Sequence, residues 1–302
     1  MPNLHHTLDW IRLASLRLRA RTVADGVYAG SHRSRRHGSG VEFRGHRAYV
    51  PGDDLRWLDR HALMRHDRLL VRQFETETER VLSLVVDASL SMGYRSRQAS
   101  GSKLEYAALV AAALGWVAAS GGDRLALDWL GGSGAAPMSA RGGREASDRL
   151  VGSLENVQPA GDLSRDGPAV ERVLTRVARQ TGRGAVVVLL SDLLDLPELT
   201  LERLAALAIR GRVVVAVRVL DPVELRFPFS RPVTLQASEG RIRVEADPAH
   251  ARAGYLQALE RVVRLWDVQL TSRRGRLVRA STTDDPVAVV QTTLDAVAGR
   301  RV

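Results

Sequence analysis

One short stretch carries oxygen-bearing side chains at every second position, an arrangement suited to binding a cation. Asp87, Ser89 and Ser91 follow directly after six mostly aliphatic residues, 81–86, which predict a short buried strand. The three side chains offer a carboxylate and two hydroxyls from a single turn. Oxygen ligands suit Mg²⁺ or Mn²⁺, and hydroxyls leave positions on the ion open for an outside ligand. The alternative is a polar loop in which a serine caps the next helix and Asp87 is solvated.

A second carboxylate follows another predicted strand. Residues 185–190 are all aliphatic, and Ser191 and Asp192 come directly after them. In a doubly wound parallel sheet, the carboxyl ends of two strands meet at the topological switch point, where ligands bind. The sequence therefore predicts that Asp87 and Asp192 face one site.

The elements that must position these residues alternate between strand and helix. This alternation predicts an α/β fold with a mostly parallel sheet. An antiparallel hairpin outside the sheet is predicted at 233–235 and 241–244, and a short strand at 268–270. The other predicted strands are 125–130, 213–219 and a short edge strand at 136–139. The predicted helices are 3–21, 104–119, 144–154, 169–180, 199–210, 248–266 and 285–297.

Composition narrows the function classes. The chain has 302 residues and no cysteine, which excludes disulfides, thiolate metal sites and a cysteine nucleophile. Its net charge is +10, but among 44 basic residues only Lys103 is a lysine. Such a bias is typical of a GC-rich genome rather than of a selected phosphate-binding surface. No specific nucleic-acid binding is therefore expected, although the arginine run from Arg12 to Arg36 remains a candidate anion-binding surface.

Neither of the usual membrane signals is found in the sequence. The longest apolar run, 107–119, is too short to span a bilayer, and the first residues lack the pattern of a signal peptide. We expect a soluble, cytoplasmic protein with no membrane span.

A second motif precedes the Asp87 strand. Arg47, Tyr49, the turn 51–54 (Pro-Gly-Asp-Asp) and Arg56 occur in a fixed order, followed by a predicted strand. This order resembles the hallmark of a bacterial family, domain of unknown function 58, in which such a segment leads into an Asp-x-Ser-x-Ser loop. The resemblance extends from about residue 30 to the C-terminus. One departure is Arg60, which stands where the family usually has tryptophan.

The resemblance implies a von Willebrand A-like domain at 81–302, with the hairpin inserted at about 222–250. Residues 1–80 would form a basic, family-specific segment that packs on it. It also implies a metal-ion-dependent adhesion site, in which a third loop donates threonine. The loop 159–168 has no threonine, so Ser164 is taken as the ligand and Asp162 as its rival; Asp195 is a further supporting candidate. The implied ligands of Mg²⁺ or Mn²⁺ are Asp87, Ser89, Ser91, Ser164 and Asp192.

The function implied by the resemblance is non-catalytic protein binding. Proteins of this family are commonly paired with MoxR-type AAA+ ATPases, which implies an adaptor in chaperone-like maturation or metal insertion. A client protein would complete the metal with an acidic residue. The residues assigned to partner binding are Arg47, Asp53, Asp54 and Arg56.

Two enzyme classes are excluded because their motifs do not match. Lys103 follows Ser102 without the glycine spacing of a phosphate-binding P-loop, and Ser89 lacks the flanking glycines of a nucleophile elbow. A Mg²⁺- or Mn²⁺-dependent phosphoesterase is conceivable, because Asp87 and Asp192 could hold a cation, but no general base is evident. Anion or nucleic-acid binding by the arginine run also stays open.

Overall fold

The structure is a computed structural model that describes residues 15–31, 43–48, 70–74, 80–236 and 243–299. Contacts divide the chain into two units, one formed by residues 1–31 with 80–302 and the other by residues 32–79. The sequence predicted a single boundary at residue 80. In the smaller unit, strand β1 (Phe43–Ala48) pairs antiparallel with β2 (Leu70–Phe74).

The larger unit is built on a six-stranded sheet with the strand order β10-β7-β6-β3-β4-β5. Neighbouring strands are parallel except at one edge, where β5 runs antiparallel to β4. The predicted α/β fold with a mostly parallel sheet is confirmed. The strands are β3 (Val81–Ala88), β4 (Arg124–Gly131), β5 (Met138–Arg141), β6 (Val186–Ser191), β7 (Val213–Leu220) and β10 (Arg276–Ser281).

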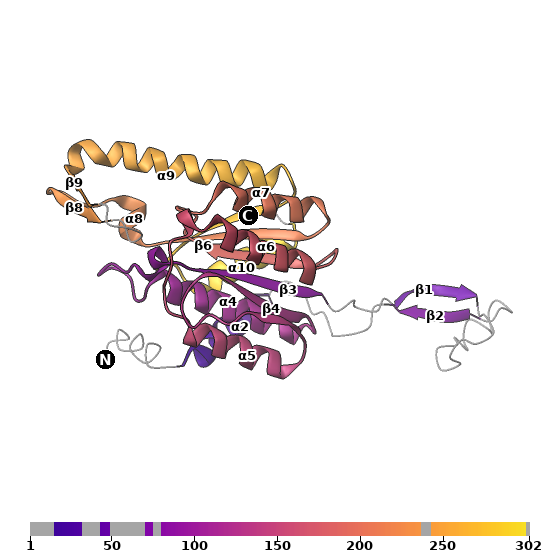
Figure 1. Cartoon of the computed structure of the whole chain (residues 1–302). Helices are drawn as coiled ribbons and strands as arrows, with labels where there is room; N and C mark the ends of the chain where they lie inside the picture. Colours follow the sequence, from indigo (N-terminus) through magenta and orange to yellow (C-terminus); the bar gives the residue numbers. More distant parts are fainter. Residues whose placement is uncertain (1–14, 32–42, 49–69, 75–79, 237–242, 300–302) are drawn as a thin grey trace, which may run out of the picture. The chain divides into compact units, whose positions relative to one another are not determined.

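Helices cover both faces of the sheet, and each face has its own apolar core (Figure 1). Aliphatic runs form the central strands because both of their faces are buried. In β3, Val86 faces one core and Val85 the other. The first core is covered by α2 (Leu16–Ser31), α4 (Lys103–Ser120), α5 (Arg144–Asn156) and α10 (Pro286–Val297), and the second by α6 (Gly167–Gln180), α7 (Glu198–Ile209) and α9 (Pro248–Thr271).

Helix α4 is the central helix of the first core. Its start is fixed by a capping box, in which Ser102 and Glu105 each accept a hydrogen bond from the other's backbone N–H. By length and composition, α4 is also the one helix among the described residues that is long and apolar enough to cross a membrane. However, 67% of this 18-residue helix is buried inside the larger unit.

The N-terminal helix extends further than the sequence predicted. The predicted helix 3–21 lies partly outside the described residues, and the observed α2 continues to Ser31. Ala20, Val23 and Val27 are buried against the first core. These residues continue an apolar stripe at helical spacing beyond residue 21, which explains the extension.

The predicted strand at 268–270 is wrong. Helix α9 runs without interruption to Thr271. Val263, Trp266 and Leu270 lie on its buried side, so the apolar stripe continues at helical spacing through the predicted strand. Among the six strands of the central sheet, the one that sequence reasoning missed is β10, an edge strand in which arginines interrupt the aliphatic pattern.

The predicted hairpin is confirmed. Strands β8 (Val233–Gln236) and β9 (Arg243–Ala246) pair antiparallel in a separate two-stranded sheet. Helix α8 (Pro222–Arg226) precedes them and follows directly after β7. Two short 3₁₀ turns, η3 (Leu90–Gly93) and η4 (Leu163–Arg165), lie in the loops that follow Asp87 and precede α6.

Candidate cation and ligand site at the strand ends

Asp87 lies at the end of β3, beside the end of β6. Val86 is opposite Leu190 in the parallel pairing, so the next residue of each strand falls side by side. The Ser191 hydroxyl donates a hydrogen bond of 2.6 Å to Oδ2 of Asp87. Asp87 is buried, with 1% of the residue exposed, so it is not a solvated loop carboxylate.

The two predicted serines lie against Asp87. The Ser89 backbone N–H donates to Oδ1 of Asp87 at 2.9 Å. The hydroxyls of Ser89 and Ser91 are 3.1 Å apart, and both residues are buried. Ser89 precedes η3 but makes no side-chain cap, and α4 is capped by Ser102. The Ser89 hydroxyl is thus placed at Asp87 and Ser91 rather than used for capping.

Lys103 is the residue that sequence reasoning missed. Its Nζ lies 2.8 Å from Oδ2 of Asp192 and 2.7 Å from Oε1 of Glu224, and the residue is 1% exposed. The other oxygen of Asp192 accepts the Leu194 backbone N–H at 3.1 Å. One ammonium therefore joins the start of α4 to the end of β6 and to α8.

The position of Glu224 is fixed by the start of α8. Asp221 and Glu224 form a capping box, with the Asp221 N–H donating to Oε2 of Glu224 at 2.9 Å. Asp221 also accepts the Ser96 backbone N–H at 2.9 Å, which ties the loop after β3 to α8. The Tyr255 hydroxyl of α9 donates to the Glu224 carbonyl at 2.8 Å. The Asp-x-x-Glu spacing signals this cap in the sequence, but not its contact with Lys103.

Burial and like charge dominate the electrostatics of the site. Burial and the neighbouring Asp192 raise the pKa of Asp87 from 3.8 to about 6. Hydrogen bonds from Ser191 and Ser89 oppose this rise. Burial also raises the pKa of Glu224, although Lys103 opposes the rise. For Lys103, burial alone would lower the pKa, but Asp192 and Glu224 outweigh burial and raise it. The ammonium is therefore charged at neutral pH, where the carboxylates Asp87, Asp192 and Glu224 outnumber it.

The third predicted loop also packs against the site. The Ala160 N–H donates to the Ala88 carbonyl at 2.8 Å, and the Leu90 N–H to the Gly161 carbonyl at 3.1 Å. Ser164 is exposed, and its hydroxyl donates to Oδ1 of Asp162 at 2.5 Å. The two rival ligands are thus bonded to each other, and the choice between them stays a prediction.

Asp195, the supporting candidate, is exposed on the loop after Asp192. Burial of its carboxyl group, followed by Asp192 and Asp162, raises its pKa, while Lys103 lowers it. Asp195 follows Asp192 by three positions, in the loop at the same end of the sheet. It therefore adds negative charge around the site.

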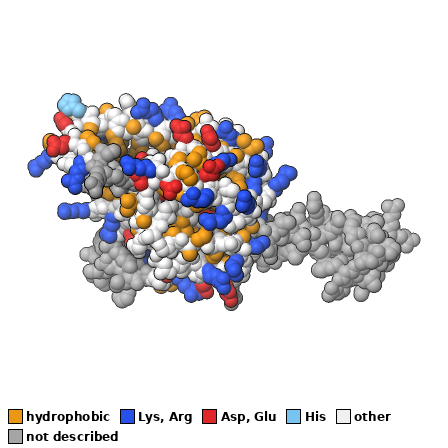
Figure 2. Space-filling view, viewed as in Figure 1, with side chains coloured by type: hydrophobic (Ala, Val, Ile, Leu, Met, Phe, Trp, Pro, Cys, Tyr) orange, Lys and Arg blue, Asp and Glu red, His pale blue; other side chains and the backbone are white. Residues whose placement is uncertain are grey.

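The predicted partner-binding residues lie in the smaller unit. Arg47 is in β1, opposite Val71 of β2. Asp53, Asp54 and Arg56 lie outside the described residues. In the larger unit, Arg17 of the arginine run pairs with Asp148 at 2.7 Å. Figure 2 shows arginines dispersed among acidic and apolar side chains on the visible face, rather than gathered in one patch.

The donors of the strand-end site fit a hard cation by type. Its donor atoms are carboxylate and hydroxyl oxygens, which suit Mg²⁺ or Mn²⁺ and not a soft metal. The fit is incomplete in one respect, because Lys103 and the Leu194 N–H already engage both oxygens of Asp192. Within the described ranges, no group of three or more His, Cys, Asp or Glu side chains is placed to hold a metal ion.

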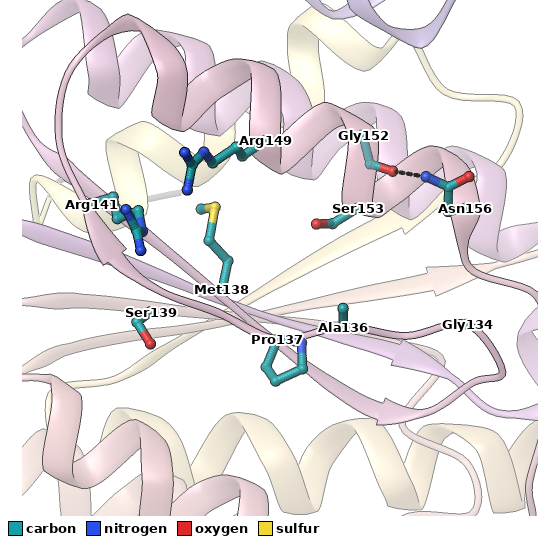
Figure 3. A pocket seen from close by; sticks show the side chains of 10 residues that line it. All are labelled: Gly134, Ala136, Pro137, Met138, Ser139, Arg141, Arg149, Gly152, Ser153 and Asn156. Atoms are coloured by element: carbon teal, nitrogen blue, oxygen red, sulfur yellow. Dashed lines mark hydrogen bonds between the residues drawn. The ribbon is translucent and has the colours of Figure 1, made fainter.

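Two of the hollows on the described part of the larger unit bear on the site and its controls. A pocket of about 450 Å³ between β5 and α5 has Arg141, Arg149 and Met138 near one end and Ser153 and Asn156 near the other (Figure 3). None of its ten described lining residues is acidic. A groove of about 850 Å³ runs between α7 and α9 and begins at Leu193, next to Asp192.

The sequence matches a known protein family over most of its length. The profile of the family described as protein of unknown function DUF58 matches residues 45–263, which is well over half of the chain. The chain belongs to this family. The resemblance identified from the Pro-Gly-Asp-Asp motif and the Asp-x-Ser-x-Ser loop is thereby confirmed.

Relatives of this DUF58 chain include the uncharacterized protein Mb1516 of Mycobacterium bovis. It is 31% identical over 239 residues, which cover 78% of this chain and 74% of the relative. A protein of Mycobacterium tuberculosis, Rv1480, matches with the same identity and coverage.

Solved structures with a similar fold include BatB from Bacteroides thetaiotaomicron. The TM-score is 0.43 at 15% identity, covering 73% of this chain and 99% of that one. A von Willebrand factor type A structure from Catenulispora acidiphila has a TM-score of 0.38 at 14% identity, covering 76% of this chain and 43% of that one. The DUF58 chain has the predicted α/β fold, and von Willebrand A-like structures are among its neighbours.

Proposed function

We propose that this chain is a non-catalytic adaptor that binds proteins through the strand-end site, together with a MoxR-type AAA+ ATPase. The observation that carries the proposal is the convergence of Asp87, Ser89, Ser91 and Asp192 at the ends of two neighbouring central strands. Ligands bind at such strand ends in open α/β sheets. The excess of carboxylates over the one ammonium supports the uptake of a cation there.

The cation in this proposal is Mg²⁺ or Mn²⁺. Asp87, Ser89, Ser91 and Asp192 are the residues that would hold it, and Ser164 stays the candidate from the third loop. When bound, the ion supplies a Lewis-acidic centre that attracts an acidic side chain of a client protein. The chain's own hydroxyls add no charge, so the ion would keep much of its attraction for an incoming carboxylate.

The side chains at the site favour binding over catalysis. The Ser89 hydroxyl lies 3.1 Å from the Ser91 hydroxyl, and the carboxylate beside it, Asp87, is one of the residues that would hold the cation. Lys103 is held as a charged ammonium by two carboxylates, so it does not serve as a general base. We expect no turnover of phosphoesters, peptides or nucleotides in a hydrolysis screen with Mn²⁺. Activity that disappears in Asp192→Ala would contradict the adaptor function and favour the phosphoesterase.

The test of the proposal is a binding measurement with the purified MoxR-type ATPase of the same genome. Wild type is compared in Mg²⁺ and in EDTA, together with the double variant Ser89→Ala/Ser91→Ala. The matched control is Ser139→Ala/Ser153→Ala, which removes two hydroxyls at the pocket between β5 and α5. We expect EDTA and the first variant each to weaken binding more than tenfold, or about 1.4 kcal/mol. Equal binding in all four conditions would overturn the proposal.

A further inference from the structure

Lys103 occupies a place in the fold where a lysine is unfavourable on local grounds. It is the first residue of α4, and the N-terminus of a helix carries a partial positive charge that repels a cation. It is also 1% exposed, although a lysine is rarely fully buried unless it is paired. Of the chain's 44 basic residues, Lys103 is the single lysine and the other 43 are arginines. The local cost must therefore be offset by what the ammonium contacts.

What the ammonium contacts is the carboxylate cluster itself. Its Nζ lies within 2.8 Å of Asp192 and 2.7 Å of Glu224, and 5.9 Å from the centre of the Tyr94 ring. The Asp192 oxygen that it contacts belongs to one of the residues that would hold a divalent cation. Asp87, the other such carboxylate, is held by Ser191 and Ser89 and not by Lys103.

We propose that Lys103 is the built-in cation of the strand-end site. The ammonium pairs with Asp192 and Glu224 in the metal-free protein, and it competes with a divalent cation for Asp192. A divalent cation that enters beside Asp87 is repelled by the Lys103 ammonium, and Asp192 is already paired with that ammonium. Lys103 therefore sets a low affinity for the metal, while the paired carboxylates keep the site folded without one. This inference rests on the proposed function, because it concerns the regulation of the same site.

The first experiment measures Mn²⁺ binding by titration calorimetry. It compares wild type with Lys103→Met, which removes the charge at similar length, and with Lys103→Arg, which keeps the charge. We expect Lys103→Met to bind Mn²⁺ at least tenfold more tightly than wild type, and Lys103→Arg to stay within about threefold of it. Circular dichroism establishes whether Lys103→Met is folded. If the folded variant binds Mn²⁺ no more tightly than wild type does, the proposal is overturned.

The comparison of the two proteins separates this inference from the proposed function. If wild type binds no Mn²⁺ but Lys103→Met does, the metal dependence proposed for the protein fails and the role of Lys103 stands. If both bind equally, the metal site stands and the role of Lys103 fails. If neither binds, both are overturned.

A second measurement covers the case in which Lys103→Met does not fold. Wild type labelled with ¹⁵N-lysine has a single side-chain ammonium, so its NMR signal needs no assignment. In EDTA at neutral pH we expect this signal to be observable, because burial and two ion pairs slow hydrogen exchange with water. The double variant Asp192→Asn/Glu224→Gln should lose it. An ammonium signal absent from folded wild type, as for a solvated lysine, would overturn the proposal.

Discussion

In two regions of the central sheet a buried carboxylate contacts a cation, and the regions differ in how these charges balance. In the middle of β4, Asp128 is paired with Arg176 of α6, whose Nε lies 2.5 Å from Oδ1. At the strand ends, Lys103 is shared by Asp192 and Glu224, and Asp192 in turn raises the pKa of Asp87. We call these the mid-sheet pair and the strand-end cluster. The mid-sheet pair is balanced, whereas the cluster has an excess of negative charge.

The cations of the two regions also differ in their exposure. The Arg176 side chain is 41% exposed and reaches in from solvent, whereas that of Lys103 is 1% exposed. An arginine that extends from the surface keeps part of its hydration, so the mid-sheet pair has the character of a structural contact. A lysine enclosed by carboxylates has lost its contact with water, and its partners are part of a candidate binding site. Burial of charge alone therefore does not single out a candidate site; here the excess of negative charge at a strand end does.

The largest expected difference concerns removal of each cation. Lys103→Met should destabilise the metal-free protein by about 3–5 kcal/mol, because it leaves two buried carboxylates without their partner. Arg176→Met should cost about 1–3 kcal/mol, since only Asp128 loses a partner. Urea unfolding in EDTA measures both. An equal cost for the two variants would remove the distinction between the regions.

The second prediction concerns pH. The folded protein holds a proton on Asp87 up to a pKa of about 6, whereas the ordinary value is 3.8. Between these values the unfolded chain ionises Asp87 while the folded state keeps it protonated, so the metal-free folded state loses stability as the pH rises, by up to about 3 kcal/mol. Asp87→Asn should remove this part of the pH dependence, and Asp128→Asn should leave it. Urea unfolding in EDTA from about pH 4 to pH 7 tests this; wild type and Asp87→Asn with parallel profiles would contradict it.

The smallest expected effect sharpens the role of Ser191. Ser191→Ala removes the 2.6 Å hydrogen bond to Asp87 and the 3.0 Å bond from the Leu193 N–H. We expect a loss of about 1–2 kcal/mol in the free energy of unfolding and a pKa of Asp87 above that of wild type, because the bond favours the charged form. The pH profile of unfolding reports both. Ser139→Ala, on an exposed position, is the control and should be neutral.

Much of the fold follows from the sequence because its central strands are buried on both faces. Mostly aliphatic runs marked β3, β4, β6 and β7 within a few residues of their observed ends. The same runs end at Asp87 and Ser191, which is why the residue pattern predicts the candidate site. The edge strand β10 was missed, since Arg276 and Arg279 interrupt its short aliphatic pattern.

The Lys103 contacts were not predictable by the same reasoning. Lys103 and Glu224 are separated by 121 positions, and their meeting depends on how α4 and α8 pack. The signal that was present is compositional, a lone lysine in an arginine-rich chain. The choice between Ser164 and Asp162 also stays undecided by sequence, because both lie in one irregular loop. Residue types within a loop do not determine which oxygen points to the site.

The most direct test of the central claim is a Mn²⁺ titration that compares the two regions. Wild type, Asp87→Ala and Asp128→Ala are titrated under identical conditions, with circular dichroism to establish that each variant is folded. We predict weak binding of Mn²⁺ to wild type and to Asp128→Ala, and its loss in Asp87→Ala. Identical titrations for wild type and folded Asp87→Ala would show that the strand-end cluster is not a cation site.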